Sequence, residues 1–421
     1  MMNLFDTAFT HPTTKILSSI SSRLEGKRIV LGITGSIASF LAPQLARELI
    51  RRGATVIPVM TEAALTMIGK DLMWWATGVE PITRITGNLE HIAFAGVMNR
   101  PVDLMLIFPA TTNTVAKLAA GIADTPVTLI ASSLQGAGVK IQVMAVAHED
   151  LINADAIKEA IEKLKSRGVH FIEPIREEGK AKVPPIEEVV FDVMSLLTPK
   201  SLKGYHAIIT GGPTIERIDN VRYITNPASG KTAIALALEA KLHGAKVSLI
   251  LGPTREPIPR ILDPIKIESA KQMKEEVLKR VKDEKKAIVI LSAAVADFTP
   301  DTTRQGKTKS DQEMDLHLVP TEKISDLIKP TNSDALLVVY KAEWGISRSE
   351  LIARAREKMK KTGADLVIAN DLSKEGAGFG TDTNVVLMIR PDGRVREIRD
   401  LKTAIAYEIM RYLIRKHIQD D

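Results

Sequence analysis

The stretch of sequence that decides the fold reads Ala207-Ile208-Ile209-Thr210-Gly211-Gly212-Pro213-Thr214 and continues, from residue 221, Val221-Arg222-Tyr223-Ile224-Thr225-Asn226-Pro227-Ala228-Ser229-Gly230-Lys231. A short apolar run ends at two glycines, a polar loop carries Asn226, and a Ser-Gly pair opens an alanine-rich segment, residues 232–243, that we expect to be helical. A strand, a loop and a helix N-terminus in this order collect free backbone N–H groups and the positive end of a helix dipole. The stretch therefore predicts a binding site for an anionic group.

Two familiar nucleotide-binding motifs do not fit this stretch. Gly230-Lys231-Thr232 looks like the end of a P-loop, but that motif needs a glycine where the chain has Thr225. Gly211-Gly212-Pro213 does not fit the dinucleotide fingerprint, and the next strand, expected at 246–251, ends in Gly252 without an acid for a ribose. The site is therefore predicted to be a nucleotide-type site of another design.

Length and composition favour a globular protein of two domains. The chain has 421 residues, more than one ordinary core accommodates, of which 45% are hydrophobic and 26% charged. The longest apolar runs, at 102–110 and 287–296, are too short to cross a bilayer and are typical of buried parallel strands. Residues 1–26 lack the apolar segment of a signal peptide. We therefore expect a cytoplasmic protein with no membrane partner.

Cysteine and charge exclude several further classes. The chain has no cysteine, which excludes disulfides, thiolate zinc sites and cysteine nucleophiles. The net charge of +6 is compatible with nucleic-acid binding, but charges of both signs alternate along helical stretches such as 348–361, and aromatic residues make up only 4%. We therefore expect no nucleic-acid partner, and the lysine excess suits small phosphorylated ligands equally well.

The N-terminal half begins with a strand, a turn, a helix and a second strand. Residues 27–33 and 54–60 have the apolar pattern of strands, and residues 37–52 have that of a helix. This order is typical of the right-handed crossover in a parallel sheet, whose ligands bind at the carboxyl ends of the strands. We therefore expect one crevice to be lined by Gly35, Ser36 and Thr61.

A histidine and an asparagine are further candidates in this half. His91 lies in Glu90-His91-Ile92, and a strand expected at 102–108 leads into Pro109-Ala110-Thr111-Thr112-Asn113-Thr114. A lone histidine is more often structural than catalytic, and an asparagine after a strand is usually a helix cap. The residue types alone leave both interpretations open.

Taken together, the N-terminal motifs resemble the flavin-dependent phosphopantothenoylcysteine decarboxylases. The resemblance rests on Gly32-Ile33-Thr34-Gly35-Ser36-Ile37-Ala38, on the motifs around His91 and Asn113, and on Gly121-Ile122-Ala123-Asp124, and it spans residues 25–190. It implies a flavodoxin-like domain in which His91 is catalytic in an oxidative decarboxylation and Asn113 binds the substrate. Such a flavin takes a hydride from the cysteinyl moiety and returns it after carbon dioxide has left. The FMN-binding residues that the resemblance implies are Gly35, Ser36, Thr61, Thr111 and Thr112.

Two segments depart from the pattern of that family. The Pro-Ala-Met-Asn segment of the family reads Ala145-Val146-Ala147-His148 here, and whether His148 replaces the asparagine stays open. The loop that carries a cysteine proton donor in many bacterial members corresponds to Glu177-Glu178-Gly179-Lys180-Ala181-Lys182-Val183. Lys180 and Lys182 are the candidates for the proton donor, and phosphate binding is their alternative role. Cysteine-free versions resemble archaeal members.

A polar, proline-containing segment, Thr198-Pro199-Lys200-Ser201, separates the two halves and follows an amphipathic helix expected at 186–197. We expect an N-terminal extension at 1–26, a decarboxylase domain at 27–197 and a second domain at 198–421. The predicted fold class is α/β, with two doubly wound, Rossmann-like domains.

Strand ends in the C-terminal half offer more candidate site residues. Asp297 follows a strand expected at 287–291 and is either a metal or base contact or a turn residue. Gly306-Lys307-Thr308-Lys309 places two lysines in a polar loop, where they are either solvated or able to neutralise phosphate. Further strands are expected at 336–340, 364–369 and 384–389, before a closing helix at 400–417.

The C-terminal motifs resemble the phosphopantothenate–cysteine ligases over residues 200–415. The opening stretch, Ala293-Ala294-Val295-Ala296-Asp297, Ala369-Asn370-Asp371 and Phe379-Gly380 recur in the order of that family. The resemblance implies that phosphopantothenate attacks the α-phosphate of CTP, that Asn226 holds the acyl-cytidylate, and that Lys307 stabilises charge as it forms. The nucleotide-contacting positions that it implies are Gly211, Gly212, Ser229, Gly230, Ala293, Asp297, Lys307, Tyr340, Lys358 and Lys361.

Two substitutions concern the choice of base. Tyr340 stands where bacterial ligases have phenylalanine, and Thr321 replaces an asparagine, so the preference for CTP over ATP stays open. Mg²⁺ is implied by the charge of the nucleotide, with Asp297 as its candidate ligand.

The two resemblances together predict a bifunctional enzyme of coenzyme A biosynthesis. It is expected to make 4′-phosphopantetheine from 4′-phosphopantothenate, L-cysteine and CTP, ligation first and decarboxylation second, with FMN and Mg²⁺. The family also implies a homo-oligomer, with trimers through the flavin domain and dimers through the ligase domain combining into a dodecamer. The alternative is a ligase whose N-terminal module binds FMN without catalysis, a reading favoured by the missing cysteine.

Overall fold

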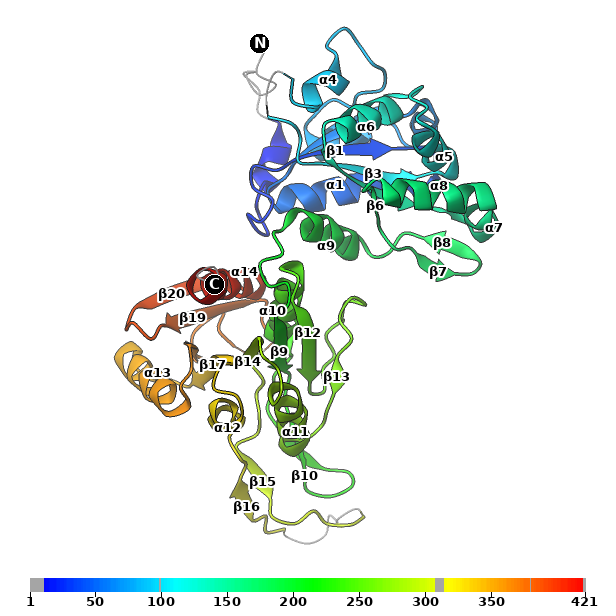
Figure 1. The fold of residues 1–421 in the computed structure, drawn as a ribbon. Coiled ribbons are helices and arrows are strands. Elements are labelled where there is room, and N and C mark those ends of the chain that lie inside the picture. The colour runs from blue at the N-terminus through cyan, green and yellow to red at the C-terminus, as the bar shows by residue number, and fades with distance from the viewer. Residues whose placement is uncertain (1–10, 98–99, 307–313, 379, 419–421) are drawn as a thin grey trace. The chain divides into compact units, whose positions relative to one another are not determined.

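The computed structural model describes residues 11–97, 100–306, 314–378 and 380–418, and the chain divides into two compact units, Met1–Leu197 and Thr198–Asp421 (Figure 1). Each unit has its own sheet and its own hydrophobic core. Lys307 and Phe379 lie outside the described residues, so the role predicted for Lys307 stays a prediction.

The N-terminal unit is built on a five-stranded parallel sheet. Its strand order is β2 (Thr55–Met60), β1 (Arg28–Ile33), β3 (Leu104–Ala110), β4 (Lys140–Ala145) and β6 (His170–Phe171). This is the order of flavodoxin-like folds, whose ligands bind where the order of the strands reverses, here between β1 and β3. The predicted α/β, flavodoxin-like fold is confirmed.

Helices cover both faces of this sheet, which explains the apolar character of its strands. β3, for example, is buried along its whole length. The core on one face includes residues of α1 (Ala42–Arg51), α3 (Lys70–Thr77) and α9 (Ile186–Leu197), and the core on the other includes residues of α5 (Thr112–Ala120), α6 (Pro126–Gly136) and α8 (Asp155–Ser166). Shorter helices are η1 (Pro12–Ile16), η2 (Ile37–Leu41), α2 (Glu62–Leu65), α4 (Glu90–Phe94) and α7 (Glu149–Asn153).

The single helix predicted at 37–52 is wrong in one respect, because it is two helices. The 3₁₀ helix η2 comes first, and α1 starts at Ala42. The Ser39 hydroxyl donates hydrogen bonds to the carbonyls of Thr34 (2.8 Å) and Ser36 (2.6 Å), which tightens the chain at the turn after β1. Pro43, in the first turn of α1, has no N–H and so cannot donate a hydrogen bond that would continue η2.

The C-terminal unit is built on an eight-stranded sheet. Its strand order is β13 (Ile265–Lys266), β12 (Lys246–Leu251), β9 (His206–Gly211), β14 (Ala287–Leu291), β17 (Leu336–Glu343), β18 (Leu366–Asp371), β19 (Thr383–Ile389) and β20 (Val395–Leu401). The first six strands follow the Rossmann order, which reverses between β9 and β14. The predicted doubly wound fold is confirmed, with the addition that β19 and β20 are antiparallel.

Helices also cover both faces of the second sheet. The core on one face includes residues of α10 (Lys231–Leu242) and α14 (Lys402–Leu413), and the core on the other includes residues of α11 (Ala270–Val281), α12 (Ile324–Thr331) and α13 (Arg348–Thr362). The closing helix predicted at 400–417 is shorter than expected, because β20 continues to Leu401 and the chain after α14 forms the π-helical turn Ile414–Ile418.

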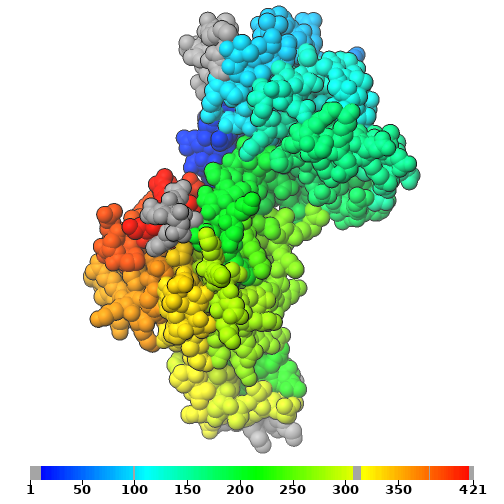
Figure 2. Space-filling model, in the orientation of Figure 1, coloured from blue at the N-terminus to red at the C-terminus, as the bar shows by residue number. Residues whose placement is uncertain are grey.

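Two small ribbons lie side by side at one end of the C-terminal unit (Figures 1 and 2). They are the hairpin of β10 (Ile215–Arg217) with β11 (Tyr223–Thr225) and the ribbon of β15 (Phe298–Pro300) with β16 (Leu318–Pro320). Val221, Tyr223 and Phe298 expose 55%, 50% and 52% of their surface there. Large apolar side chains of this kind on one surface are typical of an interaction site.

Candidate active sites

A cavity of about 530 Å³ lies in the C-terminal unit where the strand order reverses. It is lined by the ends of β9 and β14, by the first turn of α10, by β17 and by the loop after β18. This volume is within the range of small-ligand sites. Among the predicted nucleotide positions, the cavity brings together Gly212, Asn226, Ser229, Gly230, Ala293, Asp297, Tyr340 and Lys358.

Glycines allow β9 to approach α10 at the floor of this cavity. A Cβ on Gly211 would lie 2.2 Å from the Cβ of Ala233, so a side chain there would force the strand and the helix apart. Gly212 has a φ of +70°, and Gly230, the N-cap of α10, has a φ of +84°. Gly230 has no side chain to cap the helix, and the N–H of Lys231 donates to the Ser229 hydroxyl at 3.4 Å, so the N–H groups of Thr232 and Ala233 are left for a ligand. The anion site predicted from the sequence therefore has a physical basis.

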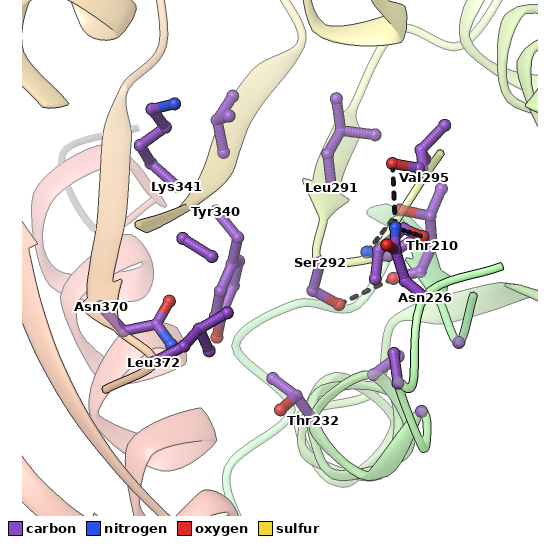
Figure 3. A pocket seen from close by; sticks show the side chains of 18 of the residues that line it. Thr210, Asn226, Thr232, Leu291, Ser292, Val295, Tyr340, Lys341, Asn370 and Leu372 are labelled. Atoms are coloured by element: carbon purple, nitrogen blue, oxygen red, sulfur yellow. Dashed lines mark hydrogen bonds between the residues drawn. The ribbon is translucent and has the colours of Figure 1, made fainter. Parts of the chain in front are cut away.

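The side chain of Asn226 is fixed at the wall of the cavity (Figure 3). Its amide nitrogen donates hydrogen bonds to the carbonyls of Ala294 (3.1 Å) and Val295 (3.4 Å). Since both neighbours are acceptors, the amide orientation is defined, and the amide oxygen is left to accept a bond from a ligand. The preceding residue is also anchored, because the Thr225 hydroxyl donates to the carbonyl of Thr214 (2.8 Å).

Short hydroxyl side chains tie the other loops of the cavity together. Ser292 donates to the carbonyl of Thr210 (2.7 Å), and Thr254 donates to the carbonyl of Ser229 (2.6 Å). Thr321, which replaces an asparagine of the family, donates to the carbonyl of Ala296 (2.6 Å). These bonds hold the loops that follow β9, β12 and β14 in one arrangement.

The charged side chains predicted to meet the nucleotide are mostly paired. Asp297 is 71% exposed and forms an ion pair with Lys323. Lys358 lines the cavity and bonds Asp326 at 3.0 Å, whereas Lys361 bonds the same carboxylate at 2.6 Å and does not line the cavity. Burial raises the pKa of Asp326, but its bonds to Lys361 and Lys358 outweigh burial and bring the pKa down to about 2.

Lys231 resembles a P-loop lysine in sequence only. Its ammonium bonds Asp382 at 2.7 Å and the carbonyl of Gly380 at 3.0 Å, with Glu256 at 3.7 Å. The bond to Asp382 contributes most to the raised pKa of Lys231. The lysine thus anchors the loop before β19 against α10.

Tyr340 and three residues without a predicted role form the other end of the cavity. Tyr340 lines it from β17, and burial raises the pKa of its hydroxyl. Asn370, Asn384 and Lys402 also line it, although each exposes less than a tenth of its surface. Burial, then the charge of Lys231, lowers the pKa of Lys402. Asn370, Asn384 and Lys402 escaped prediction because three separate elements, β18, β19 and α14, bring them together. The only sequence signal was the polar residue Asn370 at the end of a buried strand.

Gly252 explains why β12 carries no ribose-binding acid. A Cβ on Gly252 would lie 1.7 Å from the carbonyl oxygen of Pro213. The end of β12 is therefore packed against the backbone that follows β9.

In the N-terminal unit, the predicted FMN residues lie at the ends of β1, β2 and β3. Ser36, Thr61 and Thr111 are the N-caps of η2, α2 and α5, and each side-chain oxygen accepts a bond from the backbone of its helix. Thr112 is the first residue of α5. A Cβ on Gly35 would lie 2.6 Å from the Cβ of Ala63, so glycine lets the turn after β1 approach α2.

His91 is held on a short helix by its neighbours. Glu90 bonds the hydroxyl of Thr86 at 2.6 Å, and the carbonyl of His91 accepts a bond from Ser133 of α6 at 2.9 Å. Leu89, which precedes the helix, has a φ of +52°, a strained value for a side chain of this kind. Within the described part of the chain, the buried Nδ1 of His91 has no hydrogen-bond partner. Asn113 is exposed in the first turn of α5.

The structure brings together the two segments that depart from the decarboxylase pattern. β5 (Ala147–His148) pairs with β8 (Lys180–Lys182), which pairs with β7 (Ile175–Glu177), and His148 stands opposite Lys180. Lys182 bonds Glu178 at 2.8 Å, and this bond contributes most to its raised pKa. Lys180 is exposed, whereas the ammonium of Lys182 is engaged by Glu178.

The described residues contain no group of three or more His, Cys, Asp or Glu side chains placed to hold a metal ion. Over the same ranges, no helix combines the length and the apolar character needed to cross a membrane.

Fold and sites together define a two-unit α/β flavoprotein with a nucleotide-type cavity in its second unit. Residues 17–198 match the family described as "Flavoprotein", and residues 202–416 match the "DNA/pantothenate metabolism flavoprotein C-terminal domain".

Relatives of known name align with almost the whole chain. The "Coenzyme A biosynthesis bifunctional protein CoaBC" of Thermococcus kodakarensis is 43% identical, over 91% of this chain and 93% of its own. The protein of the same name from Methanocaldococcus jannaschii is 38% identical, over 90% and 91%. A crystal structure of the C-terminal domain of such a protein is 31% identical with a TM-score of 0.44, and it covers 53% of this chain and 100% of its own. The chain belongs to the family of coenzyme A biosynthesis bifunctional proteins, as the sequence motifs predicted.

Proposed function

We propose that this chain makes 4′-phosphopantetheine from 4′-phosphopantothenate, L-cysteine and CTP. The C-terminal unit is the phosphopantothenate–cysteine ligase, and the N-terminal unit is the FMN-dependent phosphopantothenoylcysteine decarboxylase. The observation that supports the ligase most directly is the fixed amide of Asn226 in a cavity at the reversal of the strand order. Family membership supports the pairing of both activities in one chain.

In the ligase reaction, a carboxylate oxygen of phosphopantothenate attacks the α-phosphate of CTP and pyrophosphate leaves. The amine of cysteine then attacks the acyl carbon, loses a proton and expels CMP. We assign the binding of phosphate oxygens to the N–H groups at the start of α10 and to the ammonium of Lys358, and the orientation of the acyl-cytidylate to the amide oxygen of Asn226. We assign Lys307 the neutralisation of charge during nucleotidyl transfer, on the family resemblance.

Mg²⁺ is proposed to enter with the nucleotide. Among the described residues, two acids line the cavity, Asp297 and Glu322, and Glu322 is paired with Lys274 at 2.6 Å. The described ranges contain no larger cluster of possible metal ligands. We therefore expect the triphosphate to supply most of the ligands and Asp297 to exchange Lys323 for the ion or its water.

The residues of the N-terminal unit fit FMN. Three helix N-termini with hydroxyl caps and a glycine turn lie where the strand order reverses, between β1 and β3. Among the described residues, the buried Nδ1 of His91 has no hydrogen-bond partner. When bound, the flavin supplies hydride acceptance and return. We assign cofactor binding to Gly35, Ser36, Thr61, Thr111 and Thr112, proton removal from the substrate thiol to His91, and substrate binding to Asn113. Lys180 is the proposed proton donor.

Two assays test this function. Pyrophosphate release from CTP that requires phosphopantothenate would establish the ligase, and its absence with both CTP and ATP would contradict the proposal. Carbon dioxide release from phosphopantothenoylcysteine would establish the decarboxylase. A yellow protein that binds FMN and releases no carbon dioxide would instead support the non-catalytic module.

The proton donor is tested separately. Lys180→Gln should slow decarboxylation, whereas Lys182→Gln should affect it less because Glu178 and Glu177 already bind that ammonium. Equal activity of both variants and the unaltered protein would exclude the two lysines as donors.

We also propose a cytoplasmic homo-oligomer. The exposed apolar side chains on the β10–β11 and β15–β16 ribbons suit a dimer contact of the C-terminal unit, and the exposed Phe40 and Trp75 suit a contact of the N-terminal unit. Light scattering would distinguish the expected dodecamer from a dimer or trimer.

A further inference from the structure

Tyr340 and Asn370 occupy neighbouring strands at the end of the cavity away from Asn226 (Figure 3). β17 and β18 pair in parallel, with Tyr340 opposite Ile368 and Ala342 opposite Asn370. Partners in register point to the same side of a sheet, so the side chains of Tyr340 and Asn370 share one face. Figure 3 shows the amide of Asn370 at the hydroxyl end of the tyrosine ring, beside Leu372.

The hydroxyl of Tyr340 is a buried polar group that has no hydrogen-bond partner among the described residues. Asn370 is 6% exposed and lines the cavity next to it. A buried hydroxyl without a partner destabilises a fold, so its position at the end of a binding cavity calls for a ligand that satisfies it.

The other polar groups at this end are already engaged. Lys231 bonds Asp382, and Lys402 bonds the carbonyl of Thr381. The oxygen of Asn384 accepts a bond from the N–H of Val385 at 2.8 Å. The hydroxyl of Tyr340 and the amide of Asn370 are therefore the groups best placed to read a ligand.

The surroundings suit a flat base better than a phosphate. The tyrosine ring and the side chains of Leu372 and Ala377 form an apolar slot, and the N–H groups that suit phosphate lie at the start of α10. Cytosine offers an amino donor beside a ring-nitrogen acceptor, whereas uracil offers the reverse pattern.

We propose that the Tyr340 hydroxyl and the Asn370 amide recognise the amino-bearing edge of the nucleotide base and discriminate CTP from UTP. The hydroxyl donates to the ring nitrogen, and the amide oxygen accepts from the amino group. This inference rests on the proposed ligase function and adds to it the residues that select the base.

The test compares Tyr340→Phe and Asn370→Ala with the unaltered protein, using CTP and UTP as alternative nucleotides. Each variant should lower the CTP-to-UTP ratio of kcat/KM by about tenfold, while the KM for phosphopantothenate stays the same. Without nucleotide, Tyr340→Phe should melt at the same or a higher temperature, because it removes an unpaired hydroxyl. The rise in melting temperature that CTP alone causes should shrink in both variants.

Tyr205→Phe is the matched control, because Tyr205 is buried and does not line the cavity. It should leave the nucleotide ratio unchanged. An unchanged ratio in both cavity variants would overturn the inference, as would a raised KM for phosphopantothenate in place of a changed ratio. If the unaltered protein ligates with no nucleotide, the proposed function fails, whereas ligation with CTP and unaltered selectivity in the variants refutes this inference alone.

Discussion

The structure leaves no room for a side chain at Gly211, so a substitution there should lower the stability of the C-terminal unit. Gly211→Ala should destabilise the C-terminal unit by about 1–3 kcal/mol, because the new methyl group would collide with Ala233 and push α10 away from β9. The same shift should weaken nucleotide binding at the start of α10. Denaturant unfolding and the CTP-induced change in melting temperature measure the two effects.

Gly136→Ala is the control for that change. Gly136 ends α6, and a Cβ there would meet nothing within 4 Å, so the substitution should be neutral or stabilising. Equal stability of Gly211→Ala and the unaltered protein would show that strand and helix separate without cost.

Asn226 gives a second prediction at the residue scale. In Asn226→Asp, a carboxylate would face the carbonyls of Ala294 and Val295 and lose both hydrogen bonds, so the side chain should leave its position. We expect ligation to slow by about 100-fold or more. Steady-state pyrophosphate release is the measurement, and Asn220→Asp, an exposed change outside the cavity lining, is the control.

The positions of some site residues could be predicted from the sequence, and those of others could not. The places of Thr61 and Thr111 after strands were predictable from local patterns. Asn226 was predicted in a polar loop and singled out by the family motif, whereas the structure places it directly after the short strand β11. Asn384 and Lys402 were not predictable, since β19, β20 and α14 bring them to the cavity only after the antiparallel edge has formed. The pairing of Lys361 with Asp326 is likewise a property of two helices in contact, α12 and α13.

At the scale of elements, α9 gives a pH-dependent prediction. Burial first, then the nearby carboxylates of Glu188 and Glu173, raise the pKa of Asp192 to about 6. The folded unit therefore favours the neutral acid, and the associated stability, complete below pH 4, is lost as the pH rises through 6. Asp192→Asn should raise the free energy of unfolding by about 1–3 kcal/mol at pH 8 and change it little at pH 4.

Urea unfolding at the two pH values checks this prediction. Glu187→Gln, an exposed change on the same helix, should show no such pH dependence. A stabilisation by Asp192→Asn that is equal at pH 4 and pH 8 would show that Asp192 does not titrate in this range.

Some helices and strands were predictable from the sequence, and others were not. α9 begins and ends where its apolar periodicity predicted, at Ile186 and Leu197. β20 was not anticipated because most of its residues are polar and exposed, and only its partner β19 makes it a strand. The break between η2 and α1 depends on hydroxyl bonds of Ser39 that periodicity does not reveal.

At the scale of the whole molecule, the two units should be separable by mutation. His91→Asn should abolish decarboxylation while ligation and the flavin colour persist, and Asn226→Asp should do the reverse. A mixture of the two variants should convert phosphopantothenate to phosphopantetheine, because the intermediate is released and taken up by the other protein. Loss of both activities in either variant would contradict the division of labour at residues 197 and 198.

The close packing of Gly252 against Pro213 has a consequence for how this fold can evolve. In dinucleotide-binding folds, an acid at the end of the second strand hydrogen-bonds the ribose. Residue 252 cannot become such an acid, since any side chain there would collide with the backbone of the loop after β9. A descendant that bound a dinucleotide in this way would first have to rebuild the loop after β9, because a main-chain contact, and not a side chain, blocks the position.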